Sequence, residues 1–338
     1  MRKVSVIILN WNGRKMLEQF LPSVVRNTSQ RWAEVVVADN GSDDDSIDFL
    51  RREFPDVKII SMERNFGFAE GYNKAIASCD SEYVVLLNSD VETPEGWIEP
   101  LVEYMEGHPE VVASQPKILS YAEKEKFEHA GAAGGFIDNY GFPYCRGRIF
   151  SVVEEDRGQY DDVMQVFWAT GAALFIRRKE YLAVGGLDAS FFAHMEEIDL
   201  CWRLNSRGKK LVCVPQSHVY HLGGGTLNTS SPRKTYLNFR NNLLMIFKNE
   251  TEDRLSKVLF MRKILDNVAA VMFLLKGEKD NFKAVRKARK EFKKIKSEYQ
   301  HKREENLRDQ IVCEYPYNYK KSIVFAFYAL QKRYFHQL

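Results

Sequence analysis

The chain has 338 residues, of which 45% are hydrophobic and 28% are charged. These values exclude a disordered or collagen-like protein and suit about two modules of roughly 150 residues each, or one large domain with an appendage. The net charge is only +3, but residues 251–338 carry 21 basic and 11 acidic residues, whereas residues 1–250 carry 28 and 35. A basic C-terminal segment predicts an anionic partner, either a membrane surface or a nucleic acid.

Elements alternate between strand and helix over the first 115 residues. Such alternation implies a doubly wound, mostly parallel sheet. In sheets of this kind, ligands bind beyond the carboxyl ends of the strands. Polar residues stand at those ends: Asn10, Asn12, Asp39, Asn65, Asn88 and Asp90. The apolar runs that predict buried strands are 4–9, 34–38, 57–61, 83–87 and 111–114, and the helical segments between them are 14–26, 43–54, 68–78 and 95–106.

The remaining chain is less regular. Residues 116–165 contain glycine-rich stretches that suggest loops and short hairpins, and 188–208 is expected to be a loop that leads into a helix. Residues 166–176 return to a buried apolar pattern, 210–214 is expected to be a strand, and from Tyr236 onward the chain is expected to be mostly helical.

Cysteine usage and the lack of a targeting segment predict a cytoplasmic protein. The five cysteines form no CxxC pair, which argues against a zinc ribbon or a disulfide framework and favours a reducing compartment. The apolar stretch after Lys3 is too short for a signal-peptide core, and no stretch approaches the roughly 20 apolar residues of a spanning helix.

The strand ends suggest a nucleotide site. Neither GxGxxG nor GxxxxGK[ST] occurs, which argues against a dehydrogenase and a P-loop ATPase. Asp39 can accept hydrogen bonds from a pyrimidine N–H or a ribose hydroxyl, or it caps the next helix. Asp90 can hold a divalent cation that also binds a diphosphate, or it forms a turn. Gly67 and Gly71 permit either close approach of an anion to the helix that starts near Asn65 or tight packing on the sheet.

Six motifs carry a resemblance to a known family. They are ILNWNG (8–13), VVADNGSDDDS (36–46), RNFGFAEGYN (64–73), LLNSD (86–90), GGLDASFFAHMEEIDLCWR (185–203) and VYHLGGGT (219–226). In this order they resemble glycosyltransferase family 2, the inverting enzymes with a GT-A fold, and particularly its bacterial rhamnosyltransferase-like branch. The resemblance implies an α/β catalytic domain at 1–250, and we expect a basic amphipathic helical extension at 251–338.

The resemblance also implies a site for a nucleotide-sugar and for Mg²⁺ or Mn²⁺. The expected metal ligands are Asp90 and His221, although His221 could instead hold the glycine loop that follows it. Asn88 stands where the family usually has the first aspartate of Asp-x-Asp, which lowers the charge of the site. The residues assigned to the nucleotide-sugar are Asn10, Asn12, Asp39, Asn65, Gly67, Gly71, Asn73, Asn88 and Gly171.

The general base is expected near residue 197. Glu197 occupies the position of the base in the family motif Glu-Asp-x-Asp, and Glu196 is the alternative. Asp199 is expected to fix the loop or to pair with Arg203. Apolar neighbours imply partial burial, which would raise the pKa of the base toward the working range.

The C-terminal extension predicts a membrane contact. Residues 255–275 have apolar side chains at helical spacing, 279–309 is highly charged, and 315–338 is rich in aromatic residues. Basic amphipathic helices of this kind are typical of a membrane interface, whereas the alternative is a helical bundle packed on the catalytic domain. No nucleic-acid-binding module is recognisable, so we expect peripheral association with the inner face of the cell membrane.

The expected function is transfer of a sugar from dTDP-rhamnose or a UDP-sugar to a glycan or lipid-linked acceptor in bacterial surface-polysaccharide assembly. One alternative is a nucleotidyltransferase, although NWNGRK is a poor match to its basic glycine-rich loop. The other is a non-catalytic relative that binds a nucleotide-sugar and acts as a scaffold, which Asn88 and the Glu196–Glu197 pair favour.

Overall fold

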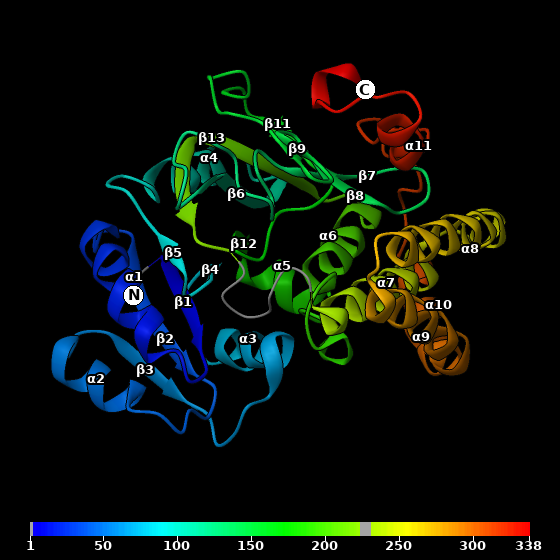
Figure 1. The fold of residues 1–338 in the computed structure, drawn as a ribbon. Coiled ribbons are helices and arrows are strands. Elements are labelled where there is room, and N and C mark those ends of the chain that lie inside the picture. The colour runs from blue at the N-terminus through cyan, green and yellow to red at the C-terminus, as the bar shows by residue number, and fades with distance from the viewer. Residues whose placement is uncertain (1–2, 224–230) are drawn as a thin grey trace.

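The computed structural model describes residues 3–223 and 231–338 (Figure 1). Its main sheet has the strand order β11-β13-β6-β12-β4-β1-β2-β3, and β5 pairs with β13. Most of its strands run in the same direction, namely β1, β2, β3, β4, β6 and β13, whereas β12 is antiparallel to both of its neighbours and β11 and β5 are antiparallel to β13. The strands are β1 (Val4–Asn10), β2 (Ala33–Asp39), β3 (Lys58–Ser61), β4 (Tyr83–Leu87), β5 (Val91–Glu92), β6 (Val111–Ser120), β11 (Met164–Gln165), β12 (Ala173–Arg177) and β13 (Lys210–His221). The expected mostly parallel α/β sheet is therefore confirmed.

Helices cover both faces of this sheet. Alternate residues of β1 face two separate cores: Val6 and Ile8 pack with the helices of one face, and Ile7 packs with those of the other. This explains why the central strands read as continuous apolar runs. The first face is covered by α1 (Arg14–Asn27), α2 (Ser46–Glu53) and α4 (Glu99–Gly107), and the second by α3 (Gly67–Ala77), α5 (Arg178–Ala183) and α6 (Glu196–Ser206).

Two strands are longer than expected. β6 and β13 continue to pair after a register shift between Cys213 and His218, and the polar residues in their second halves interrupt the apolar pattern on which the prediction depended. Within the buried stretch 166–176, the residues that form a strand belong to β12. Residues 166–172 instead pack beside a second, antiparallel sheet, which contains the expected hairpin. Its strands are β7 (Gly135–Ile137), β8 (Pro143–Cys145), β9 (Arg148–Ile149) and β10 (Val152–Val153).

The C-terminal helices pack against one another and against α6 (Figure 1). The helical part begins at Pro232, before the expected domain boundary at residue 250. Within the described residues, no helix has the length and apolar character to cross a membrane. The helices are α7 (Pro232–Asn249), α8 (Glu252–Leu275), α9 (Lys279–Ile295), α10 (Gln300–Arg308) and α11 (Ile323–Tyr328), and short 3₁₀ turns occur at Ala189–Phe191, Lys296–Tyr299 and Phe335–Gln337.

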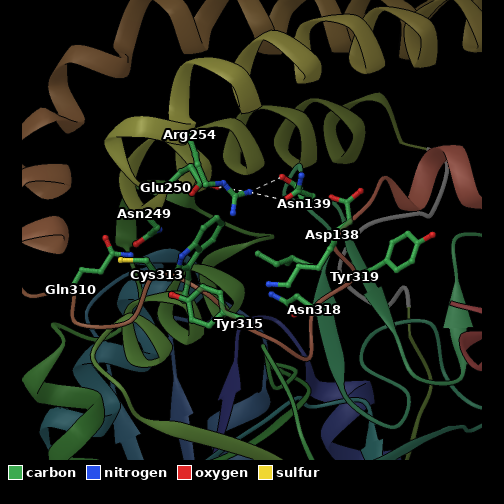
Figure 2. A pocket seen from close by; sticks show the side chains of 13 residues that line it. Asp138, Asn139, Asn249, Glu250, Arg254, Gln310, Cys313, Tyr315, Asn318 and Tyr319 are labelled. Carbon is green, nitrogen blue, oxygen red and sulfur yellow. Dashed lines mark hydrogen bonds and ion pairs between the residues drawn. The ribbon is translucent and has the colours of Figure 1, made fainter.

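The chain after α10 returns to the body of the protein. Figure 2 shows a pocket where residues 310–320 lie beside the start of α8 and beside Asn139. Arg254 closes one side of it by donating to the backbone oxygen and to Oδ1 of Asn139, at 3.1 and 2.8 Å. The pocket shares no lining residue with the expected donor site, so it is a packing feature of the C-terminal segment.

Candidate active site

The ends of β1 and β2 form one hydrogen-bonded unit. Asn10 donates through Nδ2 to Oδ2 of Asp39 at 2.9 Å, and Asp39 also accepts from the backbone N–H and the hydroxyl of Ser42, at 3.0 and 2.7 Å. Asn12 accepts from the N–H of Asp43 at 2.8 Å. Asp39 is only 1% exposed, and its Oδ1 retains one lone-pair direction for a ligand. Asp45, and not Asp39, stands at the N-terminal cap of α2.

The loop before α3 is held by amide side chains. Asn40 donates to Oδ1 of Asn65 and to the carbonyl of Gly67, at 3.1 and 3.0 Å, and Asn65 also accepts from the N–H of Gly67 at 2.7 Å. Gly71 lies so close to the strand ends that an added Cβ would come within 2.9 Å of Leu9 and 3.1 Å of Asn40. Gly71 therefore has a packing role between α3 and the sheet.

Asn73 is occupied by the protein itself. Its Oδ1 accepts from the hydroxyl of Tyr181 and from the N–H of Leu187, at 2.6 and 3.0 Å, and its Nδ2 donates to the carbonyl of Leu187 at 2.9 Å. These contacts fix the chain that leads to residue 188. The geometry thus favours a positioning role for Asn73 over the contact with the nucleotide-sugar that the sequence suggested.

Asp90 and His221 meet at the end of β13. Oδ1 of Asp90 lies 3.1 Å from Nε2 of His221, and Nδ2 of Asn88 lies 3.4 Å from the same nitrogen. On the other side of the imidazole, Oε2 of Glu128 lies 3.2 Å from Nδ1. Burial alone would lower the pKa of His221, but its hydrogen bonds to Asp90 and Glu128 and their charges raise it to about 10. The same contacts outweigh burial and hold the pKa values of Asp90 and Glu128 below their ordinary range.

This pair suits a divalent cation that is shared with a diphosphate. Among the described residues, no group of three or more His, Cys, Asp or Glu side chains could hold a metal ion. However, Mg²⁺ commonly uses one or two protein ligands and completes its shell with phosphate oxygens and water. Adjacent ligands at about 2.1 Å in an octahedral shell lie about 3 Å apart, as Asp90 and His221 do. Glu128 is placed to orient the imidazole from behind, as acceptors of the second ring N–H do in metal sites.

Glu196 and Glu197 begin α6, and each has a buried Oε2 atom with no hydrogen-bond partner among the described residues. Burial, and then the charge of Glu197, raise the pKa of Glu196 well above its ordinary value, and burial raises the pKa of Glu197. Carboxyls whose charges interact titrate as a pair, and burial makes both of these easier to protonate than exposed glutamates. Glu197 is the more exposed of the two.

The loop before these glutamates approaches the donor loop. A Cβ added at Gly67 would contact the ring of Phe192 at 3.6 Å, and one added at Gly171 would lie 3.7 Å from Glu197 and from Phe68. The start of α3, the loop before β12 and the start of α6 therefore converge at one place (Figure 1). Gly171 thus lies beside the candidate base, and Gly67 lies beside the loop that precedes it.

This loop has a strained backbone. Phe192, His194 and Met195 have φ values of 68°, 69° and 74°, a region that non-glycine residues rarely adopt. Asn241 on α7 is fully buried and donates through Nδ2 to the carbonyls of residues 191, 193 and 194, at 2.9, 2.8 and 2.9 Å. The conformation that presents Glu196 and Glu197 is therefore held from the C-terminal helices.

A buried ion-pair network also joins α6 to α7. Asp199 accepts from Arg203, as expected, at 3.0 Å, and from Lys248 at 2.8 Å. Lys248 also contacts Asp188 at 2.6 Å. Burial alone would raise the pKa of Asp188, but Lys248 and Lys302 outweigh this effect and lower the pKa below its ordinary value. Both carboxylates and Lys248 are buried, so the network fixes the catalytic helix to the helices behind it.

Two of these residues carried no signal in the sequence. Glu128 and Asn241 lie outside the recognised motifs, and only the folded chain brings Glu128 to His221 and Asn241 to the carbonyls of residues 191, 193 and 194. Residues 224–226 of the glycine motif lie outside the described residues.

Comparisons with known proteins point to glycosyltransferases. The model of glycosyl transferase family 2 matches residues 5–162. N-acetylglucosaminyl-diphospho-decaprenol L-rhamnosyltransferase of Mycobacterium tuberculosis is 27% identical over 231 residues, which cover 64% of this chain and 75% of that protein. Rhamnosyltransferase WbbL of Escherichia coli is 22% identical over 227 residues, which cover 64% of this chain and 83% of that protein.

Solved structures share the fold. GalNAc-T7 with UDP, GalNAc and Mn²⁺ superposes with a TM-score of 0.57 at 19% identity and covers 73% of this chain, which spans about half (48%) of that one. The mannosyltransferase PcManGT from Pyrobaculum calidifontis, solved with GDP-Man and Mn²⁺, has a TM-score of 0.53 at 14% identity and covers 85% of this chain and 74% of its own. The fold is thus GT-A-like. The chain is thus similar to glycosyl transferase family 2 over residues 5–162, and the curated relatives named above are glycosyltransferases that match it over 64% of its length.

Proposed function

We propose that this protein is an inverting, metal-dependent glycosyltransferase that moves a sugar from dTDP-rhamnose or a UDP-sugar to a hydroxyl of a glycan or lipid-linked acceptor in bacterial surface-polysaccharide biosynthesis. The observation that carries the proposal is the convergence of the Asp90–His221 pair with the polar strand ends and a buried carboxyl pair. Bacterial rhamnosyltransferases among the relatives support the donor and pathway.

Some of these residues would act on the leaving group, and another would act on the acceptor. Asp90 and His221 would hold the cation, which when bound neutralises the charge that develops on the leaving diphosphate. The strand-end residues Asn10, Asn12, Asp39 and Asn65, with Asn88, would hold the nucleotide-sugar. Glu197 takes the proton from the acceptor hydroxyl, so that its oxygen attacks the anomeric carbon from the face opposite to the diphosphate.

Donor turnover by the purified full-length protein tests this function. With Mn²⁺, we expect slow release of the nucleoside diphosphate from the correct donor even without acceptor, since water can replace the acceptor hydroxyl. Chelation with EDTA should abolish the release, and added Mn²⁺ or Mg²⁺ should restore it. If no dTDP-, UDP- or GDP-sugar is turned over while such donors still raise the melting temperature, the protein is a non-catalytic binder instead.

We further propose that residues 251–338 form an extension that contacts an anionic membrane through α8, and that the protein is peripheral to the inner face of the membrane. The only acidic side chain between residues 256 and 276, Asp266, is buried. Lys257, Lys263 and Lys276 are exposed. Apolar side chains on the outward face have exposed fractions of 37 to 82%: Phe260, Ile264, Val268, Val271, Met272 and Leu275. An exposed apolar stripe flanked only by lysines is typical of helices that lie in a membrane interface.

Substitution of this stripe tests the membrane contact. A variant with Phe260→Ser, Val268→Ser and Leu275→Ser should bind phosphatidylserine-containing vesicles about tenfold or more weakly in a pelleting assay, because each substitution removes apolar area from the interface. The matched control replaces three exposed apolar residues outside α8, namely Ile311, Phe325 and Leu330, with serine. Equal vesicle binding by both triple variants would contradict the role of α8.

A further inference from the structure

Arg148 is a buried arginine that lacks an anionic partner. It lies on β9 and is 9% exposed, and its Nε has no hydrogen-bond partner among the described residues. Its Nη2 donates a hydrogen bond to Sγ of Cys145 at 3.5 Å. No carboxylate of the described residues lies within 4.0 Å of it, and residues 1–2 and 224–230 contain no Asp or Glu. Its neighbour Arg146, by contrast, is paired with Asp162 at 3.1 Å.

An unpaired buried guanidinium needs an anion. Removing a charge from water without a partner costs several kcal/mol, so buried charges are normally paired or bound to a ligand. Arginine presents planar N–H donors that match the oxygens of a phosphate. Arg148 therefore has the chemistry of a phosphate-binding residue whose ligand comes from outside the chain.

Further cationic groups surround this position. Nearby protein atoms, and then the positive charges of Arg148 and Lys234, lower the pKa of His129, although its side chain keeps an exposed surface. Burial and the charge of Lys234 likewise lower the pKa of His194 to about 4. His194 also has a buried Nε2 without a partner among the described residues. The positive charges of Arg148 and Lys234 thus act on one region, which includes two neutral imidazoles.

This region has sequence neighbours in both halves of the candidate site. Lys234 belongs to the first turn of α7, which has no acidic residue and whose Arg233 lies over the ring of Phe192 at 5.1 Å. His194 precedes the Glu196–Glu197 pair by two residues. His129 follows Glu128, which contacts the imidazole of His221 on the side away from Asp90. The two histidines thus connect the cationic groups to the candidate base on one side and to the support of His221 on the other.

We propose that Arg148 and Lys234 bind a phosphate or diphosphate ester that belongs to the acceptor. The acceptor would thus be a phosphorylated molecule whose reactive hydroxyl reaches Glu197 while its phosphate reaches Arg148. The identification of the ligand as the acceptor rests on the proposed transfer reaction, but the existence of the anion site does not depend on that reaction. His194 can donate a hydrogen bond to the same anion through Nε2.

The anion site is tested by equilibrium binding of inorganic pyrophosphate to the full-length protein in EDTA, so that no metal contributes. The R148M variant should bind pyrophosphate at least about tenfold more weakly than wild type, because charge-assisted hydrogen bonds are lost. The control R157M removes an exposed arginine of the same segment, which pairs with Glu155 at 2.6 Å, and should bind like wild type. Equal affinity of R148M and wild type would overturn the site.

Two further measurements locate the anion. If saturating UDP leaves pyrophosphate binding unchanged, the site is separate from the donor diphosphate, as proposed; competition by UDP would overturn the assignment to the acceptor. The melting temperature of R148M should equal or exceed that of wild type, because a buried unpaired charge is removed, whereas a purely structural arginine would lower it. The titration requires no turnover, so its result stands even if the proposed transfer reaction fails.

Discussion

Replacing Glu197 with glutamine is expected to slow sugar transfer by about 10²–10⁴-fold, the usual contribution of a general base. Glutamine keeps the shape and the hydrogen-bonding capacity of the side chain but cannot take a proton. Glu197 is the more exposed carboxyl of the pair, and Gly171 lies beside it. The effect should appear in kcat, since the acceptor and donor contacts are unchanged.

Glu196→Gln is the matched control and decides between the two glutamates. Burial, and then the charge of Glu197, raise the pKa of Glu196, which favours its protonated form. Glutamine resembles a protonated glutamate, and this variant should therefore keep its transfer rate within a few-fold of wild type. The reverse pattern would assign the base to Glu196.

The pH dependence has a definite sign. A base works only when it is deprotonated, and burial raises the pKa of Glu197 above its ordinary value. Wild-type transfer should therefore decline as the pH falls through this raised pKa, at a higher pH than an exposed glutamate would give. In Glu197→Gln this acidic decline should disappear from the residual rate.

Replacing Asp90 with alanine is expected to reduce transfer by on the order of 10³-fold or more, because the charge on the leaving diphosphate develops in the transition state and loses its compensation. Asp90 is the only full carboxylate within hydrogen-bond distance of Nε2 of His221 among the described residues. The variant should also bind Mn²⁺ more weakly, which electron paramagnetic resonance measures without turnover.

Asp80→Ala provides the control for this substitution. Asp80 is exposed and precedes β4, at the end of the sheet opposite to Asp90, so its removal should change neither Mn²⁺ binding nor the rate. Unchanged Mn²⁺ affinity in Asp90→Ala, with the fold intact by circular dichroism, would contradict the metal assignment.

The sequence predicts the sheet well because its signals are local. Buried parallel strands need continuous apolar runs, and those of β1, β2 and β4 appear directly in the chain. The predicted metal ligands Asp90 and His221 lie 3.1 Å apart, and their role as ligands stays a prediction. The second half of β13 was missed, because its alternating polar residues follow a register shift that only pairing with β6 defines.

The supports of the site could not be predicted in the same way. Glu128 reaches His221 and Asn241 reaches the 191–194 carbonyls across 93 and about 50 residues of sequence, as their residue numbers show. The sequence around a single glutamate or asparagine in a loop or helix contains no pattern from which such a distant partner could be identified. Asn73 shows the converse: its motif suggested a ligand contact, but its amide is used by Tyr181 and Leu187.

The buried contacts of α7 make the catalytic helix dependent on the end of the chain. Arg303 on α10 is 3% exposed and donates to the carbonyls of Phe247 and Glu250, at 2.6 and 2.7 Å, while Lys248 of the same stretch neutralises Asp199. A protease cut or a stop codon after residue 250 would therefore not release an autonomous enzyme. The two parts of the chain should unfold in a single cooperative transition, and evolution could vary the outer surface of the helices far more freely than their inner one.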